Sequence, residues 1–144
     1  NLQGKIILEE QNKTDWRAAL RAEGPPGQLI DRFLREAAFE IVLSPAIIDE
    51  IVRAFAYPKV RKHIRRALDP ALWFEDIVVL AHVVPGEYEL AGVSSDPDDD
   101  KYVAAAVEGR ASFVVAGDSD LLDLKQHEGV RIITPRAFLD LIGG

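Results

Sequence analysis

The sequence predicts an α/β fold built on a mostly parallel sheet of about five strands. Short apolar runs rich in β-branched residues alternate along the chain with longer stretches whose apolar residues recur every three or four positions. Helix-start patterns precede several of those stretches, and no internal repeat or linker interrupts them. Because strand–helix–strand units normally form parallel sheets, we expect helices on both faces of the sheet.

The strand candidates share a short length and a high content of Val, Ile and Leu, as buried parallel strands require. They are "KIIL" (5–8), "FEIVL" (39–43), "AHVV" (81–84), "SFVVA" (112–116) and "VRIIT" (130–134).

The helix candidates lie between and after these strands, at 27–37, 45–57, 69–80, 98–109 and 135–142. Three dipeptides predict where helices begin, each with an N-cap residue followed by a proline at the first helical position. They are Ser44-Pro45, Thr134-Pro135 and Asp96-Pro97. Gly109 is placed where the fourth helix should end.

The length of 144 residues suits one domain with a sizeable core. The opening "NLQG" (1–4) resembles the remnant of a tag, so we expect a single domain over 5–144. Cysteine is absent, which excludes disulfides and thiolate metal sites. No apolar run approaches the ~20 residues that span a bilayer, and no signal-peptide pattern is present, so we expect a cytoplasmic protein.

Charge is unevenly distributed along the chain. The formal net charge is −7, from 24 acidic and 17 basic residues, which argues against a broad nucleic-acid-binding surface. The segment "KVRKHIRR" (59–66) is nevertheless strongly basic and could hold a phosphate backbone, although a solvated helix face explains it equally well. Its basic residues are Lys59, Arg61, Lys62, Arg65 and Arg66.

The acids are densest in "SSDPDDDKYVAAAV" (94–107). An N-cap at Asp96 and first-turn acids at Asp98 and Asp99 would each gain ~0.3–1 kcal/mol from the helix dipole, so these three require no function. Asp100 is predicted to lie past the first turn, on the same face as Ala104. For Asp100 a functional role is therefore favoured over a purely structural one.

Other acids are placed where α/β sheets bind ligands, beyond the carboxyl ends of strands. Glu9 follows the first strand, and Asp118 and Asp120 follow the fourth. Asp118 could equally cap a short helix, and Glu50, in the helix after the second strand, could be an ordinary solvated residue. If these carboxylates converge, their hard oxygens suit Mg²⁺ or Mn²⁺.

The motifs "SPAIIDE", "DPDDDKYVAAA", "GDSDLL" and "IITPRAF" together resemble the PIN-domain family, in particular its VapC-like branch of toxins from toxin–antitoxin systems. The resemblance extends over nearly the whole chain from about Gly24. It implies a three-layer α/β/α sandwich and a Mg²⁺- or Mn²⁺-dependent endoribonuclease. It also implies an RNA substrate, a cognate antitoxin partner and a homodimer.

Carried over position by position, the resemblance makes Glu50, Asp100 and Asp118 catalytic residues and metal ligands. Asp98 and Asp120 would assist from further out. In the family the first strand ends in an Asp that is the central ligand, but here Glu9 stands in that place and Asp15 follows six residues later. Either Glu9 or Asp15 completes the site, or the site is impaired.

The second departure is Ala116, where the family often has a Thr whose hydroxyl supports the site. The alternative function is therefore a PIN-fold protein that acts only by binding RNA or a protein. A phosphatase of another α/β fold ranks last, because no Asp directly follows "KIIL" to act as its nucleophile.

Overall fold

The computed structural model describes residues 5–8, 24–56, 70–90, 92, 99–117 and 119–143. Within them the strands are β1 (Lys5–Leu8), β2 (Glu40–Leu43), β3 (His82–Val83), β4 (Phe113–Val115), β5 (Gln126–His127) and β6 (Val130–Ile133). The helices are α2 (Gly24–Glu36), α3 (Pro45–Ala56), α5 (Pro70–Leu80), α6 (Asp100–Glu108), α7 (Ser119–Leu122) and α8 (Pro135–Leu141).

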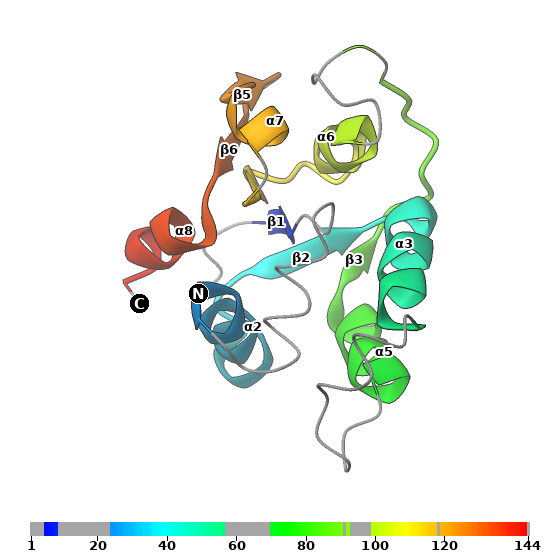
Figure 1. Ribbon diagram of the computed structural model, residues 1–144, viewed down its shortest axis with the longest axis vertical. Coiled ribbons are helices and arrows are strands. Elements are labelled where there is room, and N and C mark those ends of the chain that lie inside the picture. Colours follow the sequence, from blue (N-terminus) through cyan, green and yellow to red (C-terminus); the bar gives the residue numbers. More distant parts are fainter. Residues whose placement is uncertain are drawn as a thin grey trace.

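The strands form one sheet in the order β3-β2-β1-β4-β6-β5. All neighbouring pairs are parallel except β5 and β6, so the five predicted strands make up the parallel part. The interior strands β1 and β2 are buried along almost their whole length. Apolar residues on both faces of these strands need helices on both sides, and Figure 1 shows α6 on one side of β2 and α2 and α5 on the other. The predicted α/β fold with a mostly parallel sheet is confirmed.

Strand β5 was not predicted. It pairs antiparallel with β6 through a two-residue turn at Glu128 and Gly129, whose φ angles are 47° and 84°. Two successive positive φ angles are typical of the type I′ hairpin turn. Glu-Gly is a weaker signal for this turn than Asn-Gly or Asp-Gly, which explains why the sequence did not reveal the hairpin.

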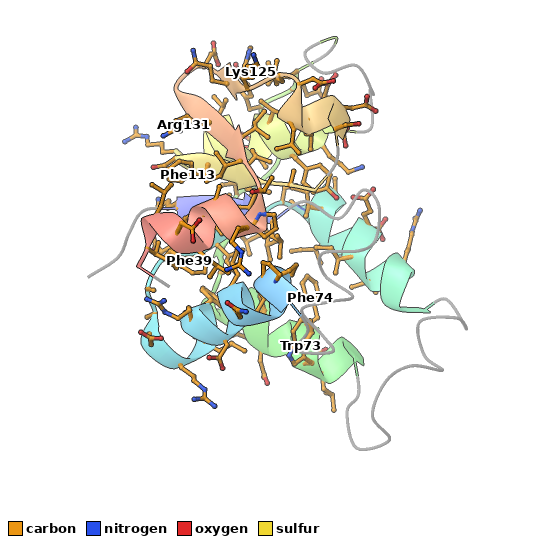
Figure 2. All side chains as sticks on the ribbon, turned by 60° about the vertical axis from the view of Figure 1, so that its left-hand side comes forward. Phe39, Trp73, Phe74, Phe113, Lys125 and Arg131 are labelled. Carbon is orange, nitrogen blue, oxygen red and sulfur yellow. The ribbon has the colours of Figure 1, made fainter. Side chains whose placement is uncertain are left out.

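Aromatic rings connect α8 to the sheet and to α2. The ring of Phe138 lies edge-on to Phe39 at 5.0 Å and to Phe113 at 5.8 Å, and Phe33 lies 5.8 Å from Phe39. The guanidinium of Arg131 covers the outer side of Phe113 at 5.7 Å. Figure 2 shows Phe113 and Arg131 side by side, with Phe39 close to α8. These contacts fasten the last helix of the chain to the first described helix, α2.

Two of the three predicted helix starts are confirmed. The Thr134 hydroxyl accepts a hydrogen bond from the Ala137 amide at 3.1 Å, and the buried Ser44 hydroxyl accepts one from the Ile47 amide at 3.4 Å. The third, Asp96-Pro97, lies outside the described residues, within which α6 is described from Asp100 with Asp99 as its N-cap. Asp100 thus belongs to the first turn of α6 rather than lying beyond it.

The predicted end of α6 at Gly109 is confirmed, for a steric reason. Its φ of −86° is accessible to any residue, so conformational freedom does not require glycine there. A Cβ at this position would lie 2.6 Å from Val42 Cγ1 and 3.2 Å from the Ala105 carbonyl oxygen. The missing side chain therefore lets the end of α6 approach β2 closely.

None of the helices in the described ranges combines the length and apolar character that crossing a membrane requires.

We predict that Gly109→Ala lowers the free energy of unfolding by about 1–3 kcal/mol, as overpacking of a rigid core typically does. Val42 is fully buried and β-branched, so it cannot rotate away cheaply. Urea unfolding of Gly109→Ala, Val42→Ala and the double variant measures the coupling between the two sites. The double variant should be more stable than the sum of the single losses implies, and strict additivity would show that Val42 is not the obstacle.

Candidate functional site

Asp100 lies at the amino end of α6, and its carboxylate is almost completely buried, with 4% of the residue exposed. Its Oδ2 atom accepts a hydrogen bond from the Gly92 amide at 3.0 Å. The preceding residue, Asp99, is fully buried as well. Because α6 connects the parallel strands β3 and β4, its amino end lies at the carboxyl edge of the sheet. Buried acids at this edge, where α/β folds bind ligands, mark a candidate site.

Glu50 reaches α6 from helix α3. Its Oε2 atom accepts a hydrogen bond from the hydroxyl of Tyr102, and its Oε1 atom forms an ion pair with Lys101 Nζ at 3.0 Å. Tyr102 is fully buried, whereas the Glu50 and Lys101 side chains are 27% and 28% exposed. Both carboxylate oxygens of Glu50 are thus engaged by the two residues that follow Asp100. This contact fixes α3 against the first turn of α6.

The Lys101 ammonium also lies 5.5 Å from the centre of the Tyr102 ring, within the range of a cation–π contact. Consecutive residues of a helix point about 100° apart, so Lys101 and Tyr102 approach the Glu50 carboxylate from different directions. Glu50, Lys101 and Tyr102 form what we call the Glu50 triad. A buried hydroxyl and a partly solvated ammonium together compensate one carboxylate charge.

A cavity of about 710 Å³ extends along α6, from Asp100 at its amino end to Glu108. The segment after β3 passes along α6, where the Glu108 carboxylate accepts hydrogen bonds from the amides of Glu87 and Tyr88 at 3.3 and 3.5 Å. The cavity is lined by Ser44, Pro45, Ala46, Pro85, Gly86, Tyr88, Glu89, Leu90, Asp100, Lys101, Ala104, Ala105 and Glu108. Asp100 and Lys101 therefore face a space large enough for a ligand group.

Tyr88, in the segment that follows β3, connects this segment to the β5–β6 turn. Its hydroxyl donates a hydrogen bond to the Glu128 carboxylate at 3.1 Å. This bond favours the neutral phenol and raises the pKa of Tyr88 above its usual value, and the nearby negative charge acts in the same direction.

The structure places Glu50, from α3, against Lys101 and Tyr102, the two residues that follow Asp100 in α6. Asp120 is half-buried in the first turn of α7, after β4. Glu9, Asp15 and Asp118 lie outside the described residues, as do Asp98 and the basic residues Lys59, Arg61, Lys62, Arg65 and Arg66. Within the described ranges, no three acidic or imidazole side chains are grouped closely enough to hold a metal ion.

The donors at this edge fit a hard divalent cation in chemical type. Asp100 and Glu50 offer carboxylate oxygens with no imidazole or thiolate beside them, which suits Mg²⁺ or Mn²⁺. A single Asp and a single Glu do not complete the six ligands that Mg²⁺ prefers, so further acids or waters would be required. The Lys101 ammonium opposes the binding of a cation at Glu50, because it is already paired with that carboxylate.

Lys101 and Tyr102 were not among the predicted site residues. Tyr102 carried a usable signal, since a tyrosine on the apolar side of a helix usually has a hydrogen-bond partner for its hydroxyl. Nothing in the local pattern identified Glu50 as that partner, because the two residues are separated by 52 positions.

A family model described as "PIN domain" matches residues 15–120 of the 144, which is well over half of the chain. The search of curated proteins returned no match. PIN domains have a nuclease-type fold, are commonly hydrolases and usually use divalent metals. The α/β fold with a mostly parallel sheet fits a PIN domain. The matched residues include α3 and α6, the helices that carry Glu50 and the buried Asp100. The chain belongs to the PIN-domain family.

Proposed function

We propose that this protein is a metal-dependent endoribonuclease and the toxin of a toxin–antitoxin pair, acting on RNA in the cytoplasm as a single PIN-like domain over residues 5–144. The observation that best supports the nuclease is the buried Asp100 at the carboxyl edge of the sheet, with Glu50 held against the next two residues of α6. The toxin role, the antitoxin partner and the homodimer rest on the family resemblance.

In this proposal, Asp100, Asp118 and Glu50 hold Mg²⁺ or Mn²⁺ together with Glu9 or Asp15, and Asp120 assists. When bound, the cation supplies charge stabilisation for in-line hydrolysis of a phosphodiester. The chain's own part is to preorganise the acids. The Gly92 amide fixes one oxygen of Asp100, and the Tyr102 hydroxyl orients Glu50. Fixed donors keep the carboxylates in place without reorganisation during the reaction.

RNA would lie across the carboxyl edge of the sheet. The basic residues Lys59, Arg61, Lys62, Arg65 and Arg66 are proposed to hold its phosphates, since a chain with net charge −7 needs a local cationic segment for this purpose.

A second candidate function is a catalytically impaired PIN protein that acts by binding RNA or a protein partner. Two observations favour it. The first strand is followed by Glu9 rather than Asp, and the Glu50 carboxylate is already neutralised within the chain by Lys101.

We predict that the purified protein cleaves a mixed RNA pool with Mn²⁺ or Mg²⁺ but not with EDTA, and that Asp100→Asn lowers the rate ~100-fold or more. Asparagine keeps an oxygen that accepts from the Gly92 amide, so the fold should survive. Asp76→Asn, an exposed site on α5, is the matched control for the lost charge and should cleave normally. Metal-dependent cleavage that survives Asp100→Asn would contradict the proposed site, and a folded protein that never cleaves would favour the impaired alternative.

We predict different outcomes for two substitutions in the Glu50 triad. Tyr102→Phe removes only the hydroxyl that orients Glu50, so it should lower the free energy of unfolding by about 0.5–1.5 kcal/mol and slow cleavage modestly. Glu50→Gln keeps an acceptor for Tyr102 but removes a ligand charge, so cleavage should fall ~100-fold, far more than for Tyr102→Phe. Urea unfolding and single-turnover cleavage of both variants provide the comparison. Equal small effects on cleavage would assign Glu50 a structural role only.

A further inference from the structure

Lys101 is a cation placed inside the acidic candidate site. Its ammonium lies 3.0 Å from Glu50 Oε1, and its side chain lines the cavity that Asp100 also faces. A nuclease site that gathers carboxylates to bind a divalent cation has no evident need for a lysine paired with one of them. The role of Lys101 therefore requires an explanation of its own.

The pair between Lys101 and Glu50 differs from several surface ion pairs of the described chain. Arg53 with Asp49 and Arg35 with Asp31 join residues four apart on one helix, and their basic side chains are 77% exposed. Lys101 and Glu50 instead join two helices and are 28% and 27% exposed. Reduced solvent screening makes such a pair stronger than an exposed one.

The contacts around Lys101 favour its ion pair with Glu50, but the partly exposed ammonium can still leave the carboxylate. The Tyr102 ring 5.5 Å away favours the cation in its present position, while the Tyr102 hydroxyl occupies the other oxygen of Glu50. The partial exposure of Lys101 and its four-carbon flexible stem allow the ammonium to swing into solvent. The contact is thus favourable and also reversible.

We propose that Lys101 is a built-in counter-ion of Glu50, which a divalent cation must displace, and that Lys101 thereby sets the affinity of the site for that cation. A second cation close to Oε1 is repelled by the ammonium, so binding costs the energy of breaking the ion pair. Without metal, the same lysine neutralises Glu50 and limits repulsion among the acids. This inference rests on the proposed function, because it takes Glu50 as a metal ligand.

Titration of the metal-free protein with Mn²⁺, followed by isothermal calorimetry, tests the proposal without measuring activity. Lys101→Gln should tighten the dissociation constant for Mn²⁺ by ~3- to 10-fold, and Lys101→Arg, which keeps the charge, should leave it near the wild-type value. Arg53→Gln removes the same charge from the neighbouring helix α3 and should change the constant by less than about twofold. Thermal unfolding confirms that each variant is folded.

The double variant Lys101→Gln/Glu50→Gln decides whether Lys101 acts through Glu50. The gain from Lys101→Gln should be much smaller in the Glu50→Gln background, because the lysine then has no carboxylate to neutralise and only its direct repulsion of the cation remains. The counter-ion role would be overturned, with the metal site left intact, by any of three results. Lys101→Gln could tighten Mn²⁺ binding equally in the wild-type and Glu50→Gln backgrounds, leave the affinity unchanged, or weaken it. Failure of wild type, Lys101→Gln and Lys101→Arg to bind Mn²⁺ would instead refute the proposed metal-dependent function, and the counter-ion role with it.

Discussion

The close packing of α6 on the sheet is the constraint on which the candidate site depends. This helix contacts β1, β2, β4 and β6, and it buries Tyr102, Val103 and the alanines at 104–106, with Gly109 as its C-cap. A larger residue at its end would collide with Val42 in β2. Because the helix lies this close, its first turn is fixed at the carboxyl edge of the sheet and carries Asp100 there.

Burial at this edge has an electrostatic consequence. Asp99 and Asp100 are almost inaccessible, and burying charged groups is costly unless hydrogen bonds, opposite charges or metals compensate them. The chain supplies part of this compensation through the Gly92 amide at Asp100 and through Lys101 and Tyr102 at Glu50. Under the proposed function, the residues that stabilise the acids in the absence of an ion would also set the affinity of the acids for that ion.

Sequence patterns predicted the fold well because each element buries a regular apolar pattern. The β-branched runs became five parallel strands, and Thr134 and Ser44 cap their helices as their positions before proline indicated. The helix start predicted at Asp96 lies outside the described residues, and the structure gives α6 from Asp100. The β5–β6 hairpin was missed because its turn uses Glu128, a residue with little preference for a positive φ.

The amino-acid sequence by itself determined the α/β class, the parallel strands and the residue types available for chemistry, since these follow from periodicity and from short motifs. It placed Asp100 and Glu50 near the carboxyl edge of the sheet, because strand ends and helix starts can be located along the chain. Only the tertiary structure decided that Glu50 meets Tyr102 and Lys101, residues about 50 positions away, and that Asp100 is tied to Gly92. Contacts between separate elements depend on how closely helices pack and in which direction side chains point, and no local pattern encodes either.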